Sequence, residues 1–141
     1  MKYFIPLLTV LLFHFSVHAQ KSPDGIIGVW LNDEKNNKIE IYKDGDTYKG
    51  RIVWIAQLDD HPGLNPKDKN NPNPEKRNQS ILGMDIITGL KYSKGKWLNG
   101  TIYNPQKGIY AYCKVELPTQ TQLDLIVSKG VFSKTKTWIK Q

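Results

Sequence analysis

A succession of short β-rich runs, each closed by turn residues, constrains the fold of this chain more than any other feature. The clearest run, Thr47–Gln57, follows the tight hairpin turn Asp44-Gly45-Asp46. Its side chains alternate between two faces, one of which holds Tyr48, Gly50, Ile52, Trp54 and Ala56. No segment beyond Ile26 shows a long apolar period of about 3.6 residues. The pattern therefore predicts an all-β protein.

Eight such runs follow one another. An eight-stranded up-and-down antiparallel barrel is favoured, because closure removes the exposed edges that an open sheet would leave. A β-sandwich is the competing architecture. Such a barrel has an interior that side chains fill or that holds one small ligand. The predicted strands are Ile27–Leu31, Lys38–Lys43, Thr47–Gln57, Leu82–Tyr92, Lys96–Tyr103, Ile109–Leu117, Gln122–Ser128 and Ser133–Lys140.

Residues 58–79 interrupt this pattern after the third strand. The segment is rich in proline and asparagine, and proline cannot donate a hydrogen bond to a sheet. Pro74–Arg77 is able to open one helical turn. A long insertion in a small domain is often a lid or a binding loop, and the alternative is a solvated excursion held by its prolines.

The N-terminus predicts export. Lys2 precedes an apolar run from Phe4 to Phe15, which is too short for the roughly 20 residues that span a bilayer. Small residues before Gln20 fit a signal-peptidase site after Ala19. We therefore expect residues 1–19 to be a signal peptide and residues 20–141 to be a single domain. The protein would be secreted or periplasmic, without an integral membrane anchor.

Composition argues against most enzyme classes. Beyond the expected cleavage site the chain has one histidine, His61, and one cysteine, Cys113. A zinc site needs three or four such ligands and a disulfide needs two cysteines. We therefore expect a protein that is not an enzyme, with no catalytic residues, no metal and no cofactor. A hydrolase that uses His61, or Asp85 between apolar neighbours, remains a minor alternative.

The basic balance does not indicate a nucleic-acid partner. The formal net charge is +7, but lysine supplies nearly all of it. The two arginines are Arg51 and Arg77, whereas nucleic-acid readers depend on arginine for bidentate contacts. Either arginine, if it lies at a barrel mouth, is able to bind a carboxylate or phosphate head group. A structural salt bridge or a contact to a helical turn is the alternative for both.

Aromatic residues are the best lead to a binding site. They combine a large apolar surface with a polar group, which suits a ligand pocket, although they also fill barrels and cover their ends. Trp30 fits a plug at one barrel end. Cys113 fits a small buried apolar residue. The candidate ligand-binding residues are Trp54, Arg77, Trp97, Tyr103, Asn104 and Tyr110.

Several motifs resemble a known family. Gly28-Val29-Trp30 resembles the G-x-W motif of lipocalins, and the further motifs are Gly50-Arg51-Ile52-Val53-Trp54, Asn71-Pro72-Asn73-Pro74 with Arg77, Gly100-Thr101-Ile102-Tyr103-Asn104-Pro105 and Thr137-Trp138. Together they resemble the secreted bacterial family catalogued as domain of unknown function twenty-one forty-seven, from Ile26 to Lys140. The resemblance implies a lipocalin-like barrel and no established activity. Members commonly carry two cysteines beside the first hairpin turn, where this chain has Asp44 and Lys49.

These observations favour an exported barrel that binds a small hydrophobic or amphipathic, partly apolar molecule in its cavity. The alternative is an envelope protein-interaction module that uses the 58–79 loop and a basic outer face on the last strand. The sequence names no protein partner.

Overall fold

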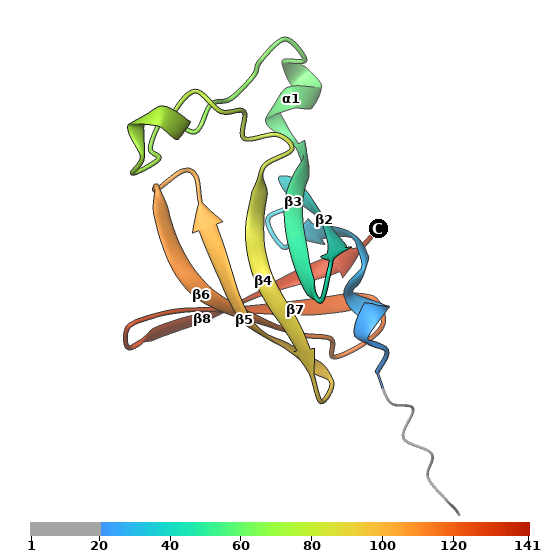
Figure 1. The fold of residues 1–141 in the computed structure, drawn as a ribbon. Helices are drawn as coiled ribbons and strands as arrows, with labels where there is room; N and C mark the ends of the chain where they lie inside the picture. The colour runs from blue at the N-terminus through green and yellow to red at the C-terminus, as the bar shows by residue number, and fades with distance from the viewer. Residues whose placement is uncertain (1–20) are drawn as a thin grey trace, which may run out of the picture.

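The computed structural model describes residues 21–141, and the predicted signal peptide lies outside the described residues. Within residues 21–141, each strand pairs antiparallel with the next and the last pairs with the first, which closes an eight-stranded barrel (Figure 1). The predicted barrel is therefore confirmed. The strands are β1 (Gly28–Asn32), β2 (Asn37–Asp44), β3 (Thr47–Ile55), β4 (Asp85–Ser93), β5 (Lys96–Asn104), β6 (Ile109–Glu116), β7 (Gln122–Lys129) and β8 (Phe132–Lys140).

The two ends of the barrel differ in what covers them. The short helix η1 (Pro23–Ile26) precedes β1, and we call its end of the barrel the η1 end. The opposite, loop end carries the β3–β4 connection with the short helices α1 (Gln57–Asp60) and η2 (Pro74–Lys76). Figure 1 shows this connection above the barrel. Within the described residues, no helix has the length and apolar character needed to cross a membrane.

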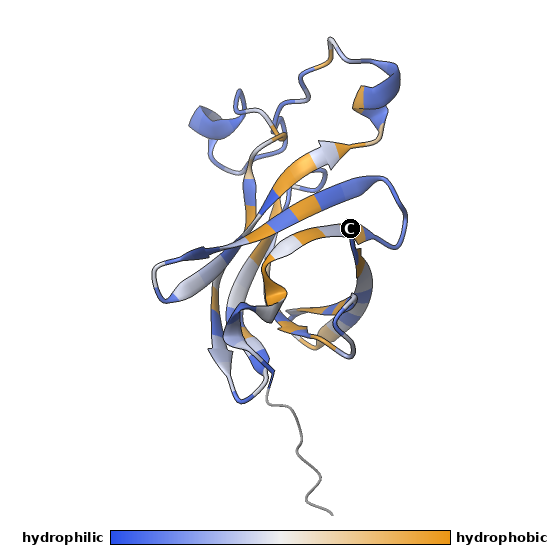
Figure 2. Cartoon of the chain, turned by 90° about the vertical axis from the view of Figure 1, so that its right-hand side faces the viewer, coloured by the Kyte–Doolittle hydropathy of each residue, from blue (hydrophilic) through white to orange (hydrophobic). Residues whose placement is uncertain are grey.

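The core is one cluster inside the barrel. Alternate residues of the strands point inward, and Figure 2 shows apolar and polar residues following one another along them. Burial of Cys113 and Val115 in β6, and of Leu123 and Leu125 in β7, follows this alternation. The fully buried members with the largest side chains are Trp30, Trp97, Ile26, Ile39, Ile41, Ile87, Leu90, Leu123 and Leu125.

The η1 end is closed by aromatic residues whose polar atoms bond to the N-terminal segment. Trp30 Nε1 donates to the carbonyl of Ile26 at 2.9 Å, and Trp97 Nε1 donates to the carbonyl of Pro23 at 3.0 Å. The Tyr48 hydroxyl donates to Asp24 at 2.6 Å. These bonds explain why these three large amphipathic rings are tolerated in the core, since each of their donors has an acceptor. Trp138 differs, because its buried Nε1 has no hydrogen-bond partner among the described residues.

The predicted face of Trp54 is wrong. Ile39 pairs with Ile52, but the next residue back, Lys38, pairs with Trp54, so Val53 is an extra residue in β3. Such a bulge reverses the alternation beyond it. Trp54 consequently leaves the face of Ile52, and Lys38 lies 5.1 Å from the centroid of its indole ring. Ile55 packs against the core instead.

The β2–β3 hairpin carries an ion pair where the resemblance implies cysteines. Lys49 Nζ lies 2.9 Å from Asp44 Oδ2, and Tyr42 pairs with Lys49 in the sheet. Both charged side chains are partly exposed, so this pair adds little to stability.

Candidate functional site

The β3–β4 connection is anchored to the outside of β5 by a buried carboxylate. Asp68 is fully buried, and its Oδ1 accepts a 2.7 Å hydrogen bond from the Tyr103 hydroxyl. Its Oδ2 accepts from Asn71 Nδ2 at 2.6 Å. Arg77 Nε extends the network by donating to the carbonyl of Asn71 at 2.8 Å. Burial and the Asp68 carboxylate raise the pKa of Tyr103, so the phenol remains a donor.

The same connection also contacts the backbone of the β5–β6 turn. Asn70 Nδ2 donates to the carbonyl of Gln106 at 2.7 Å. Gly108 has φ +65°, and a Cβ at this position would lie 1.9 Å from the Asn70 carbonyl oxygen. A glycine is therefore required here both by the backbone conformation and by the close approach of the loop.

The candidate residues separate into two groups. The rings of Tyr103 and Tyr110 lie with their centroids 4.6 Å apart. The Asn104 side chain accepts a hydrogen bond from the backbone of the adjacent turn. Arg77 is linked to Tyr103 through Asn71 and Asp68. These four side chains lie together at the loop end, outside the core cluster. Trp54 and Trp97 lie elsewhere. The sequence could not show this grouping, because the Asp68–Tyr103 contact joins residues 35 positions apart.

The remaining charged candidates are exposed or form a hydrogen bond or ion pair with a neighbouring side chain. Asp85 is exposed, contrary to the expectation of an apolar site, and accepts a 2.7 Å bond from the Tyr42 hydroxyl. Arg51 pairs with Glu40 at 2.8 Å. Burial raises the pKa of the Cys113 thiol to about 12, and the side chain is a member of the core. Among residues 21–141, no group of three or more His, Cys, Asp or Glu side chains is placed to hold a metal.

The inner face of the barrel becomes polar and solvent-accessible toward the loop end. Ile55, Ile102 and Val127 are only partly buried and pack on top of the core. Lys136 lies opposite the buried Leu125, and Lys134 lies opposite Val127. Residues directly opposite each other in an antiparallel pair share one face. The lysines of β8 therefore lie on the inner face, and the predicted basic outer face of this strand is wrong.

Sequence reasoning missed these two lysines, although a signal was present. Lys134 and Lys136 alternate with outward residues in the same way as Trp138, so all three share one face of the strand, and Trp138 is buried. Neither lysine forms an ion pair with another residue of the described chain. Together with Ile102, Ala111 and Val127 they make up the surface that we call the inner basic face.

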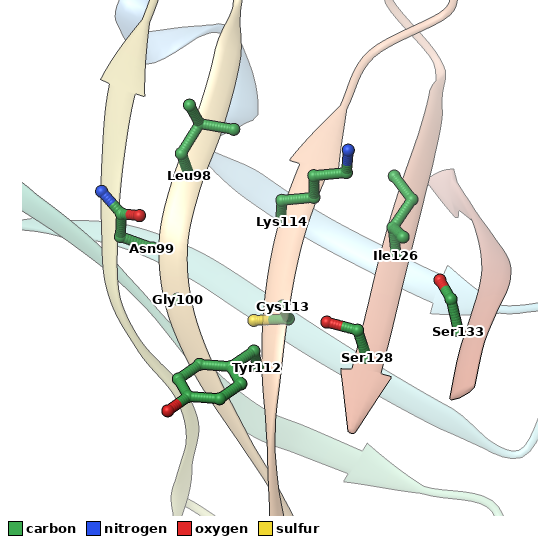
Figure 3. Close-up of a pocket in the computed structure, with 9 residues that line it drawn as sticks. All are labelled: Leu98, Asn99, Gly100, Tyr112, Cys113, Lys114, Ile126, Ser128 and Ser133. Carbon is green, nitrogen blue, oxygen red and sulfur yellow. The ribbon is translucent and has the colours of Figure 1, made fainter. Parts of the chain in front are cut away.

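Two hollows lie at the surface of the barrel, and Cys113 of the core lines part of the larger one. The larger has a volume of about 470 Å³ and lies over β5 to β8, chiefly on their outer side (Figure 3). The smaller has a volume of about 320 Å³ and lies between α1 and the segment that follows it, with Leu64 and Lys67 among its lining residues. Neither is lined by the aromatic residues of the η1 end.

Comparisons with known proteins agree with this architecture. A solved structure described as "Protein HP1028 from the human pathogen Helicobacter pylori belongs to the lipocalin family" is similar, with a TM-score of 0.73 and 24% sequence identity over 82% of each chain. A search of the curated proteins found no match. The model of the family described as uncharacterized proteins conserved in bacteria, DUF2147, matches residues 28–140. The chain therefore belongs to the DUF2147 family and has a lipocalin-like barrel.

Proposed function

We propose that this protein binds a small anionic amphiphile at the loop end of its barrel and is not an enzyme. The apolar part of the ligand would lie on Ile102, Ala111 and Val127, and its acidic group would contact Lys134 and Lys136. The observation that carries the proposal is the pair of unpartnered ammonium groups in register with core residues on the inner face.

The filling of the barrel supports this proposed position of the ligand. The η1 end and the middle of the interior are occupied by tightly buried side chains such as Trp30 and Leu90. Toward the loop end the inward residues are half-buried, so a ligand there would remove additional apolar surface from water. The ligand would therefore lie on the accessible inner face at the loop end, and not in an enclosed cavity.

An alternative role for these lysines is protection of a strand edge. β1 pairs with β8 only from Trp138 to Lys140, which leaves the segment from Phe132 to Thr137 without a partner on that side. Inward-pointing charges reduce edge-to-edge association. Under this alternative, removal of the lysines would increase self-association and leave amphiphile binding unchanged.

Titration with a fluorescent acid separates the two roles. The probe is 11-(dansylamino)undecanoate, and its methyl ester is the uncharged match. Lys134→Gln/Lys136→Gln is expected to weaken binding of the acid by at least about tenfold, since a hydrogen bond to a charged group contributes roughly 1.5–3 kcal/mol. Binding of the ester should change little.

Lys94→Gln/Lys107→Gln is the matched control, because it removes the same charge from two exposed turn lysines that form no ion pair with other described residues. Equal loss of affinity in both double variants would show non-specific attraction and contradict the proposal. Sedimentation velocity on the same samples would reveal any self-association that edge protection predicts.

Export remains part of the proposal. The basic and apolar N-terminal run supports it. Expression of the full chain in a Gram-negative host, with intact-mass measurement of the periplasmic fraction, should give a product that begins at Gln20. Recovery of the uncleaved chain in the cytoplasm alone would contradict export.

A further inference from the structure

The larger hollow presents a row of hydroxyl groups across three neighbouring strands. Tyr112 pairs with Ser128, and Ser128 pairs with Ser133. These residues share the outer face, because Cys113 and Val127 next to them point into the core. With strands about 4.8 Å apart, the row spans roughly 10 Å, which suits a short chain of linked polar rings.

An exposed aromatic ring forms part of this row. Tyr112 is 73% exposed, far more than Tyr103, and its ring lies at one end of the hollow (Figure 3). No residue of the described chain forms an aromatic stack with it. An uncovered ring of this size offers a flat apolar surface with a polar hydroxyl at its edge.

A bulge in β5 builds one wall of the hollow. Trp97 pairs with Val115 and Gly100 with Cys113, so Leu98 and Asn99 both lie opposite Lys114. Asn99 has φ +62°, a conformation that asparagine tolerates better than most residues. The bulge places an amide and an apolar side chain beside the same lysine.

The polar side chains of the hollow have unused bonding capacity. Asn99, Tyr112, Lys114, Ser128 and Ser133 make no side-chain hydrogen bond or ion pair with other residues among 21–141, while the nearby Glu116 is paired with Lys96 at 2.8 Å. Leu98 and Ile126 supply apolar contact between them. The hollow therefore combines several free donors, one free positive charge and small apolar surfaces.

We propose that this outer hollow binds an acidic oligosaccharide. Sugar rings have an apolar C–H face that packs on an aromatic ring and hydroxyl groups that exchange hydrogen bonds with serine, asparagine and tyrosine. Lys114 would contact a carboxylate on the saccharide. This site is distinct from the inner basic face, since its residues lie on the opposite side of the sheet and take a different class of ligand.

The test uses oligomers of a uronic acid, with cellohexaose as the neutral match, and calorimetric titration of the protein that begins at Gln20. The wild type should bind the uronate oligomer more tightly than cellohexaose. Tyr112→Ala should weaken both by at least about tenfold. Lys114→Gln should weaken the uronate selectively and bring the two affinities together.

The control variant Lys134→Gln/Lys136→Gln should leave saccharide binding unchanged, and thermal unfolding should show that Tyr112→Ala is folded. Absence of binding to either saccharide, or equal binding by wild type and Tyr112→Ala, would overturn the proposal. Vesicles that contain phosphatidylglycerol form a further arm. Binding to them that depends on Lys114, without saccharide binding, would show a lipid surface instead and would also overturn it.

Discussion

The two ends of the barrel differ in how completely their inward-pointing side chains are buried. At the η1 end, Trp30, Trp97 and Tyr48 are buried and each polar atom bonds to the segment that closes the barrel. At the loop end, the inward residues are half-exposed, and the long connection bonds to the outside of β5 through Asp68. Stability is therefore concentrated at one end, while charged and apolar groups remain accessible to solvent at the other.

Removal of a buried aromatic side chain at the η1 end should have the largest effect on the free energy of unfolding. Trp97 is fully buried in the core and also bonds to Pro23. Trp97→Ala is expected to lower the free energy of unfolding by about 3–5 kcal/mol, because it leaves a cavity and an unpaired carbonyl. Urea denaturation measures the change. Trp54→Ala is the matched control, and an equal loss there would show that the core is not concentrated as described.

Breaking the anchor of the long connection should have an intermediate effect. Tyr103→Phe removes the hydroxyl that donates to the buried Asp68 and should cost about 1–3 kcal/mol. Hydrogen exchange should become faster in residues 65–80 and remain slow in β1 and β2. Tyr110→Phe is the control, since its hydroxyl makes no such bond. Uniformly faster exchange over the whole barrel would mean that the loop is part of the global fold.

High pH should destabilise the fold through Tyr48 at the η1 end. Burial and the hydrogen bond to Asp24 raise the pKa of Tyr48 from 10.0 to about 12. The folded state therefore holds the phenolic proton more tightly than the unfolded state. The associated stability is present below about pH 10 and is lost as the pH rises toward 12. Urea midpoints should fall over this window, and the fall should be smaller in Tyr48→Phe. An identical pH profile in this variant would show that ionisation of Tyr48 does not cause the loss of stability.

Acid should also weaken this contact, through protonation of Asp24. The bond from Tyr48, with help from Lys43, lowers the pKa of Asp24 below 3.8. A lowered carboxyl pKa stabilises the fold above that value, and this contribution is lost as the pH falls further. Asp24→Asn should flatten the acid limb of the stability profile measured by urea midpoints between pH 5 and pH 2. A limb of unchanged slope would contradict the assignment.

The smallest effect is expected at the β2–β3 hairpin. The pair of Lys49 and Asp44 is partly exposed at 2.9 Å. Lys49→Ala should change the free energy of unfolding by no more than about 1 kcal/mol, and salt should reduce the difference. A larger loss in chemical denaturation would give this hairpin a stabilising role comparable to that of the η1 end.

Much of the fold could be predicted because the relevant signals are local. Alternation in β6 and β7 assigns Cys113 and Leu125 to the core, and turn residues separate the strands. The helical turn expected from Pro74 is present as η2. Trp54 was misplaced because one extra residue, Val53, reverses the alternation, and a bulge depends on pairing with a distant strand.

The candidate site was harder to predict because its contacts join distant segments. Asp68 meets Tyr103 only after the connection folds over the β5–β6 turn. The face of the lysines of β8 follows from the burial of Trp138 only once the pairing of β8 with β7 is known. The outer hollow has no linear motif, since its residues come from four strands.

Chemical-shift mapping with a saturating fatty-acid anion, dodecanoate, tests the division between the two ends most directly. We expect backbone and methyl shifts at Ile102, Ala111 and Val127, and side-chain ammonium shifts at Lys134 and Lys136. Trp30 and Trp97 indole signals should not move. Shifts centred on the indole signals, or on Tyr112 and Ser128 of the outer hollow, would contradict it.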